Sequence, residues 1–323
     1  MGMKAVLPSS IAPTDYEALR SDPQRWMPII AEIAAAHAIA RPRMCATPAG
    51  SNLIALLGDD LVVKLFPPFL RHQYQSERLA LQHFQSRLST PTPEIVAIGE
   101  TAGWPYLVIT RLHGVELGTI WHSCGEEEKC AILHAVGELI AEAQAIPPGE
   151  LMGLEPRWAD FVRRQAEQCR RRHERLGLPQ HLLADLPRYL TKTQGAIPTD
   201  FRPVALTGEY TPTNLLVARR AGAWHIAGLI DFGDVMVGFC EYDLLGPGAF
   251  LASGDAQRLK NLLAGFGYDA LKLTHDLSQR LMRMLLLHRY SDLNVQVKID
   301  GWKDRVRNLD ELEGLLWPVG RSG

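Results

Sequence analysis

The feature that most constrains the fold of this chain is a short island of strand-forming residues inside a long helical region. The island opens with Thr207-Gly208-Glu209, then Asn214 and an apolar run, and it closes with Gly228-Leu229-Ile230-Asp231-Phe232-Gly233-Asp234. A Gly-containing turn at 220–223 lies between the two apolar runs, which predicts a hairpin. In a hairpin, the residue that opens the first strand and the residue that closes the second lie at the same end. Asn214 and Asp231 would therefore offer an amide oxygen and a carboxylate to one Mg²⁺ ion, which prefers hard oxygen ligands and bound phosphates.

The region before this helical part has a different pattern. Apolar runs bounded by turn residues predict one strand ending near Thr47 and further strands at 53–57, 61–66, 94–98 and 106–110. Helical spacing predicts one or two short helices at 15–38, interrupted at Pro23, and a helix at 69–87. The pattern indicates an antiparallel sheet with one inserted helix.

Downstream of residue 126 the spacing is mostly helical. It predicts helices at 130–145, at 158–176 and on to about Pro187, and again at 255–266, 271–290 and 304–316. The change of pattern at His113-Gly114 predicts an N-terminal lobe of residues 1–113 and a C-terminal lobe of residues 114–323. The fold class expected is α+β, with a small antiparallel-sheet lobe and a larger helical lobe.

Composition excludes several functional classes. The chain has 323 residues, of which 46% are hydrophobic, enough for two lobes, and 34 Lys and Arg against 36 Asp and Glu give a net charge of -2. Charge therefore gives no reason to expect a nucleic acid or an anionic membrane as partner. The most apolar early stretch, residues 29–40, is too short and too polar to span a bilayer. Five scattered cysteines without metal-ligand spacing indicate reduced thiols, and we expect a cytoplasmic protein, as a monomer or a homodimer.

Four segments resemble the aminoglycoside phosphotransferase family, which are small-molecule kinases with a protein-kinase-like fold. The family signature is His-Gly-Asp, four residues, Asn, and later Ile-Asp followed at set spacing by Gly and Asp. This chain keeps the spacing and changes the His and the first Asp, with Thr207-Gly208-Glu209, Asn214, Ile230-Asp231, Gly238 and Asp243. Val62-Val63-Lys64-Leu65-Phe66 is similar to the family's third-strand lysine segment, and Ser76-Glu77-Arg78-Leu79-Ala80-Leu81 to its helix partner. The overall residue pattern, including the leader Asp15-Tyr16-Glu17-Ala18-Leu19-Arg20, is most similar to that of hygromycin phosphotransferases.

The resemblance implies a role for each matching residue. Lys64, held by Glu77, would contact the phosphates of ATP or GTP, and Asn214 and Asp231 would hold Mg²⁺. Glu209 would accept the proton of the acceptor hydroxyl. The remaining implied residues are Ser51, in a loop covering the phosphates, Thr110 and Leu112, in a hinge offering backbone groups to the base, and Asp234, near the acceptor.

The sequence leaves the function open between two classes. One is a phosphotransferase acting on an alcohol group of a small molecule, either an aminoglycoside such as hygromycin or a macrolide, choline or homoserine. The other is a nucleotide-binding pseudokinase, in which Thr207 and Glu209 mark lost catalysis. Polycationic acceptors need carboxylates, for which the candidates are Glu209, Asp234, Glu241, Asp255 and Asp292.

Overall fold

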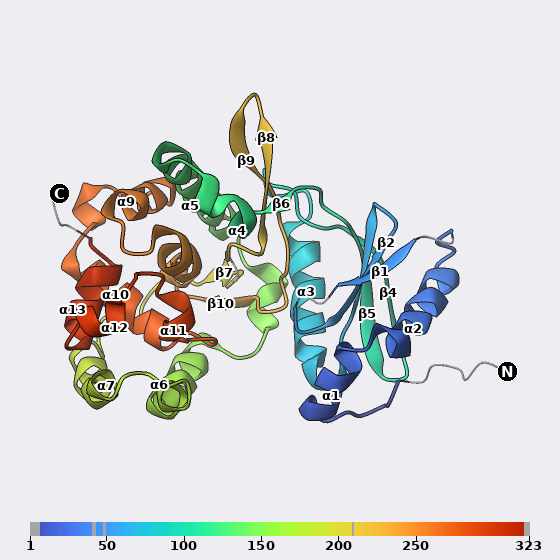
Figure 1. Cartoon of the computed structure of the whole chain (residues 1–323), viewed down its shortest axis with the longest axis horizontal. Helices are drawn as coiled ribbons and strands as arrows, with labels where there is room; N and C mark the ends of the chain where they lie inside the picture. The colour runs from blue at the N-terminus through green and yellow to red at the C-terminus, as the bar shows by residue number, and fades with distance from the viewer. Residues whose placement is uncertain (1–6, 41–42, 48–49, 209, 320–323) are drawn as a thin grey trace. The chain divides into compact units, whose positions relative to one another are not determined.

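The computed structural model describes residues 7–40, 43–47, 50–208 and 210–319, and it divides the chain into two compact units (Figure 1). The strand-rich unit takes in the chain up to Arg87, Pro91–His113 and Ile230–Asp234. The helix-rich unit takes in Leu88–Thr90, Gly114–Leu229 and the chain from Val235 onward. A short segment that follows the hairpin in sequence therefore packs with the N-terminal sheet.

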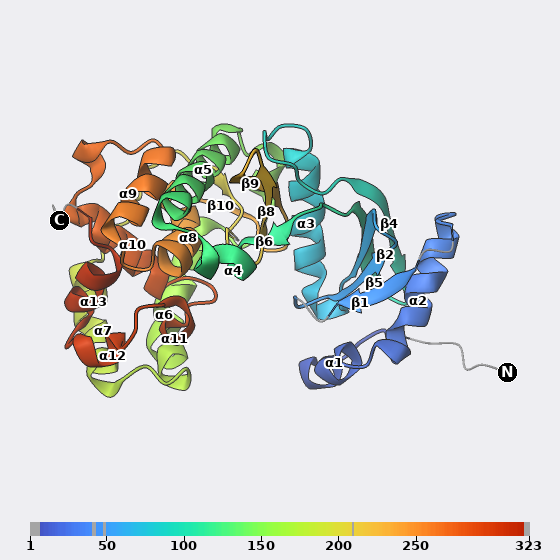
Figure 2. The ribbon, with the colours of Figure 1, turned by 45° about the horizontal axis from the view of Figure 1, so that its top comes forward.

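The strand-rich unit is built on a five-stranded antiparallel sheet with the order β1-β2-β3-β5-β4. Its strands are β1 (Met44–Thr47), β2 (Leu53–Leu57), β3 (Leu61–Leu65), β4 (Ile95–Thr101) and β5 (Trp104–Thr110). Helix α3 (Arg71–Phe84) lies on one face of the sheet, whereas α1 (Pro13–Arg20) and α2 (Pro23–Ala36) lie on the other (Figure 2). The alternation of buried side chains along β2 supports this arrangement, because Leu53, Ala55 and Leu57 enter the core shared with α1 and α2.

The strands and helices expected in this unit are present, with shifts of a few residues at their ends. Of the one or two short helices expected at 15–38 the structure has two, and Pro23, the expected interruption, is the first residue of the second, where its missing N–H costs no hydrogen bond. Strand β4 continues to Thr101, three residues beyond the predicted end. The turn at Ala102 and Gly103, both with positive φ, connects it to β5.

The helix-rich unit contains two small sheets among its helices. The sheets are β10-β7 and β6-β8-β9, and the β8-β9 hairpin is the one expected from the sequence. The strands are β6 (Val115–Glu116), β7 (Val204–Leu206), β8 (Leu215–Arg220), β9 (Ala223–Leu229) and β10 (Met236–Gly238). The helices are α4 (Leu117–Ile120), α5 (Glu126–Ala145), α6 (Trp158–Arg175), α7 (Gln180–Lys192), α8 (Leu245–Pro247), α9 (Ala256–Gly265), α10 (His275–Leu286), α11 (Leu293–Gln296), α12 (Trp302–Arg305) and α13 (Leu309–Leu316).

The expected end of the helical region at Pro187 is wrong. Helix α7 continues through Pro187 to Lys192. A proline inside a helix leaves the carbonyl four residues earlier without its N–H donor. That carbonyl belongs to Leu183, and the Arg170 guanidinium donates to it at 3.1 Å. A side chain from the neighbouring helix α6 therefore replaces the missing backbone bond.

The expected helix at 304–316 is also divided, into α12 and α13. The second begins after Asn308, whose side-chain oxygen accepts from the Glu311 N–H and caps the new helix. Within the described part of the chain, no helix is both long and apolar enough to cross a bilayer. All five cysteines have free thiols.

Candidate active site

Lys64 lies on β3, on the opposite face of the strand from the buried side chains of Val63 and Leu65. Its cross-strand neighbours are Ile54 on β2 and Leu107 on β5. The lysine is 5% exposed. Because an unpaired ammonium among apolar side chains is unfavourable by several kcal/mol, the surroundings of this strand require carboxylate partners for it.

Helix α3 supplies the first partner. Its buried residues recur at helical spacing, from Gln73 through Ser76, Glu77, Ala80 and Leu81 to Phe84, so that one stripe of the helix faces the sheet. Glu77 is 1% exposed, and its two oxygens accept from the Lys64 ammonium at 2.6 and 2.8 Å. Lys64 is therefore not an exposed lysine at a sheet edge, and Glu77 is not a solvated glutamate on a helix surface.

Asp231 supplies the second partner. Its Oδ1 lies 3.0 Å from the Lys64 ammonium, and its side chain is 39% exposed. The residue has φ of 67°, a left-handed conformation that aspartate tolerates better than most residues. The next residue, Phe232, is buried and packs its ring on Phe84 of α3, with the centroids 5.7 Å apart. These contacts hold the 230–234 segment in the strand-rich unit.

In this cluster, burial and ion pairing act in opposite directions on the pKa values of Lys64 and Glu77. Burial on its own lowers the pKa of Lys64, but the charges of Asp231 and Glu77 and the hydrogen bonds to both outweigh it, so this pKa lies above its usual value. Burial raises the pKa of Glu77 to about 7, with the Asp231 charge adding to the effect and Lys64 opposing it. The cluster therefore keeps a permanently charged ammonium next to one solvent-accessible carboxylate.

The loop that contains Ser51 is described from Gly50 onward, whereas Pro48 and Ala49 lie outside the described residues. The Ser51 hydroxyl donates to Gln73 Oε1 on α3 at 3.3 Å. The Ser51 carbonyl accepts from the Tyr16 hydroxyl of α1 at 2.7 Å. Helices α1 and α3 are therefore each hydrogen-bonded to this loop.

The expected hinge begins where β5 ends. The Thr110 N–H donates to the Glu94 carbonyl at 2.9 Å, and the Thr110 hydroxyl accepts from the Glu94 N–H at 2.8 Å. The Arg111 N–H donates to the Asp60 carbonyl at 2.7 Å. Leu112, which is partly buried, follows outside the strand. The N–H groups of residues 110 and 111 are thus already used within the unit.

The segment that opens with Thr207 and matches the family signature begins in the helix-rich unit, after β7. Its first two N–H groups, of Thr207 and Gly208, donate to the Asp243 carboxylate at 3.2 and 2.7 Å. Asp243 is 2% exposed and also accepts from Gln144 Nε2 of α5 at 3.2 Å. Glu209, the expected base, lies outside the described residues.

Asn214, the expected second metal ligand, directly precedes β8. Its N–H donates to the Thr211 carbonyl at 3.1 Å, and the following residue, Leu215, pairs with Leu229 at the end of β9. Asn214 belongs to the helix-rich unit and Asp231 to the strand-rich unit. No group of three or more His, Cys, Asp and Glu side chains among the described residues could hold a metal ion by itself.

The other acidic candidates have different surroundings. Glu241 is 1% exposed and is bonded by Arg280 at 2.8 Å and by the Tyr268 hydroxyl at 2.9 Å, so its charge is already neutralised. Asp255 and Asp292 cap α9 and α11 by accepting backbone N–H groups. Asp234 is partly exposed at the end of the 230–234 segment.

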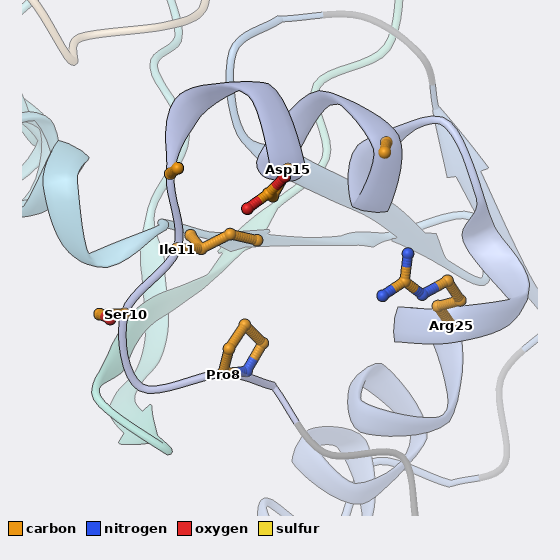
Figure 3. A pocket seen from close by; sticks show the side chains of 7 residues that line it. Pro8, Ser10, Ile11, Asp15 and Arg25 are labelled. Atoms are coloured by element: carbon orange, nitrogen blue, oxygen red, sulfur yellow. The ribbon is translucent and has the colours of Figure 1, made fainter.

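A hollow of about 530 Å³ lies at the start of the chain, between the 8–12 segment, α1 and the first turn of α2. Asp15 of α1 and Arg25 of α2 both line it (Figure 3). Neither Lys64 nor Glu77 nor Asp231 lines it. This hollow is therefore separate from the ion cluster.

Three residues of these networks are not predicted from the sequence: Asp243, which matches the family spacing without an implied role, Gln144 and Tyr16. A buried acceptor such as Asp243 leaves no local pattern, since its donors lie on other elements. The one available signal was an acidic residue inside the apolar stretch around Tyr242 and Leu244.

Known proteins support the same fold. A sequence profile of the phosphotransferase enzyme family (APH) matches residues 49–277. The GDP complex of wild-type aminoglycoside 2'-phosphotransferase-IIIa is 16% identical, with a TM-score of 0.66 over 90% of this chain and 97% of that one. The streptomycin–ATP complex of APH(2″)-IIa is 15% identical, with a TM-score of 0.59 over 82% and 91%.

A third neighbour acts on a different class of compound by its name. Macrolide 2'-phosphotransferase MphH from Brachybacterium faecium is 17% identical, with a TM-score of 0.59 over 91% of this chain and 99% of that one. At these identities the structures share the fold, a strand-rich and a helix-rich part of the kinase type, and the expected fold class is confirmed. Because the family profile matches most of the length of this chain, the chain belongs to the APH phosphotransferase enzyme family.

Proposed function

We propose that the chain transfers the γ-phosphoryl group of ATP or GTP to a hydroxyl group of a small molecule. The observation that carries the proposal is the buried Lys64, whose ammonium is bound by Glu77 and by Asp231, 167 residues away in the chain. A cluster of this kind holds the positively charged ammonium group in a fixed position. Phosphoryl transfer requires such a charge, because negative charge spreads over the phosphoryl oxygens in the transition state.

We propose Asp231 and Asn214 as the residues that would hold a Mg²⁺ ion, on the chemistry of their side chains. Asp231 offers a carboxylate that is 39% exposed, and Asn214 offers an amide oxygen. Two hard oxygen ligands suit an ion that keeps several waters and takes further ligands from phosphates, and they do not suit a soft or fully protein-bound metal. When bound, the ion would supply positive charge next to the transferred phosphoryl group.

The chain's own residues would then divide the work. Lys64 would bind the α- and β-phosphates, and the backbone at Ser51 would cover them. Backbone groups of the segment from Thr110 to Leu112 would bind the base, other than the N–H groups of residues 110 and 111, which are already bonded within the unit. Glu209 would accept the proton of the acceptor hydroxyl, with Asp234 near the acceptor.

The acceptor class rests on the neighbours and on the surface charges. Solved neighbours include complexes with streptomycin, gentamicin and kanamycin, and one is named a macrolide phosphotransferase. We propose an aminoglycoside as the first acceptor to test, with hygromycin as the compound favoured by the resemblance of the sequence to hygromycin phosphotransferases. We propose Glu209 and Asp234 as the carboxylates that would bind ammonium groups of the acceptor, whereas Glu241 is bonded by Arg280 and Asp255 and Asp292 cap helices.

The test is transfer of ³²P from labelled ATP and GTP, with Mg²⁺, to aminoglycosides, a macrolide, choline and homoserine. We expect wild-type protein to label at least one compound, and we expect Lys64→Met and Asp231→Asn to lower the rate at least a hundredfold. Asp59→Asn, in the exposed turn after β2, is the matched carboxylate control and should leave the rate unchanged.

The outcome that would overturn the proposal is nucleotide binding without transfer to any compound. If Glu209→Asp then restored transfer, the chain would be a pseudokinase whose changed base had ended catalysis. If wild-type protein labels an acceptor and Glu209→Gln does not, the assigned base is supported.

A further inference from the structure

Helix α1 reaches the turn formed by residues 50–52 with two side chains. The Arg20 guanidinium donates from Nη1 to the Gly50 carbonyl at 2.7 Å, and the Tyr16 hydroxyl donates to the Ser51 carbonyl at 2.7 Å. The two donors are four residues apart, which places them on one face of the helix. Two successive peptide carbonyls of the turn are thus bonded to the same helix.

Both donors are themselves held in place. Tyr16 is 2% exposed, and its ring packs edge-on against Phe69, with centroids 5.4 Å apart, and against Trp104 at 5.9 Å. Glu17 accepts from Arg20 at 3.2 Å from Nε and at 2.8 Å from Nη2, which fixes the plane of the guanidinium. The helix therefore presents two oriented donors and not two mobile side chains.

The direction of the carbonyls sets the direction of the N–H groups. In a trans peptide the C=O and the following N–H point in opposite directions within one plane. When the carbonyls of Gly50 and Ser51 face α1, the N–H groups of Ser51 and Asn52 face away from it. Gly50 adopts φ of 79°, which a glycine reaches without strain and which lets the chain reverse at this point. Adjacent N–H groups turned to one side form the kind of concavity that binds anions.

We propose that Tyr16 and Arg20 are positioning residues of the nucleotide site, which act by holding the 50–52 turn with its N–H groups directed at the phosphates. This inference rests on the proposed function, since it takes the turn to cover the phosphates of ATP or GTP. It adds the N-terminal helix to that site as the support that keeps the turn in its binding conformation. A turn ordered before binding loses less entropy when the nucleotide arrives.

The test is the Kd of wild-type protein and variants for Mg·ATP and Mg·GTP, by isothermal titration calorimetry, with no acceptor present. Tyr16→Phe removes one hydroxyl and keeps the packed ring, and Arg20→Met removes the other donor. We expect each to weaken binding of the preferred nucleotide about three- to tenfold, and the double variant to weaken it further. In steady-state assays the nucleotide KM should rise while kcat stays near the wild-type value.

The unit contains a matched control for each variant. Tyr106→Phe removes a hydroxyl from another buried tyrosine of the same core, whose partner is His37 at 2.9 Å. Arg71→Met removes a guanidinium that also bonds one glutamate and one glycine carbonyl, those of Glu100 and Gly103 at 2.9 and 3.0 Å. Both controls should bind the nucleotide as wild type does. If they weaken binding as much as the α1 variants do, general destabilisation explains the result and the inference is wrong.

Hydrogen exchange in the nucleotide-free protein gives a second, independent measurement. The Ser51 and Asn52 N–H groups should exchange faster in Tyr16→Phe and Arg20→Met than in wild type, and at the wild-type rate in both controls. Unchanged exchange in the α1 variants would overturn the inference whatever the Kd values are.

Lys64→Met separates this inference from the function beneath it. If wild type binds neither nucleotide, or if Lys64→Met binds as tightly as wild type, the proposed function fails, and the role of α1 fails with it. If Lys64→Met loses binding and the α1 variants do not, the proposed function stands and the inference alone is wrong.

Discussion

Replacing Lys64 by methionine should destabilise the strand-rich unit in a way that depends on pH. The change leaves Glu77, which is 1% exposed, without the ammonium that now bonds both of its oxygens. Removing one partner of a buried ion pair typically costs about 3–5 kcal/mol, because the remaining charge is buried alone. Asp231 loses the same partner, but its side chain is 39% exposed and water can replace the ammonium.

Glu77 can avoid most of this cost by binding a proton. Burial raises the pKa of Glu77 to about 7 even with Lys64 beside it, and loss of Lys64 raises it further. A carboxyl group whose folded pKa is above its unfolded pKa favours the folded state at low pH, and this stability is lost as pH rises through the folded pKa. We therefore expect a small loss of stability for Lys64→Met at pH 5.5 and a loss of about 3–5 kcal/mol at pH 8.5.

The measurement is hydrogen exchange at the amides of β3 and α3, with rates corrected for the intrinsic effect of pH, in a double-mutant cycle with Glu77→Met. The double variant has two apolar side chains in place of the pair, so it should recover most of the stability that the single variant loses at pH 8.5. Lys129→Met is the control, since the exposed partner of Lys129, Glu126 at 3.0 Å, should contribute under about 1 kcal/mol at either pH.

Two results would refute this reasoning. Equal destabilisation of Lys64→Met at both pH values would show that Glu77 does not take up a proton when its partner is removed. A double variant as unstable as the single one would show that lost packing, and not an unpaired charge, is the cause.

Three further predictions concern the helix-rich unit. Gly137→Ala should cost about 1–3 kcal/mol or more in thermal unfolding, because its Cβ would lie 2.2 Å from a backbone carbonyl oxygen of α9, whereas Gly153→Ala, with open space around it, should be tolerated. Burial raises the pKa of Asp243 to about 7, so the folded chain keeps the proton of this carboxyl group to a higher pH than the unfolded chain does. The free energy of unfolding of wild type, measured by urea titration, should therefore fall relative to that of Asp243→Asn as pH rises from about 4 to 7. A difference between the two proteins that stays constant with pH would contradict this. Tyr189→Phe should cost about 1–3 kcal/mol in chemical denaturation, because its hydroxyl donates at 2.7 Å to Glu313, which is 1% exposed, and an unchanged midpoint would show that another donor replaces it.

The sequence determined the local elements because their signals are local. Apolar runs and the Gly58-Asp59-Asp60 turn between them predicted β2 and β3, and the spacing of apolar residues predicted α3. The same reasoning indicated that Lys64 is functional, since an ammonium between Val63 and Leu65 needs a partner. The sequence prediction ended the helix at Pro187, whereas α7 continues there and Arg170, on another helix, bonds the carbonyl that the proline leaves without its donor.

The tertiary structure alone decided which distant groups meet. Asp231 joins Lys64 from 167 residues away, Asp243 collects the first N–H groups of the loop after β7, and Tyr16 and Arg20 bond the 50–52 turn. Hydrogen bonds and ion pairs of this kind act over about 3 Å, and which side chains come within that distance depends on how whole helices and strands pack. Periodicity along a chain carries no such information, so the partners of the candidate site residues became visible only in the folded molecule.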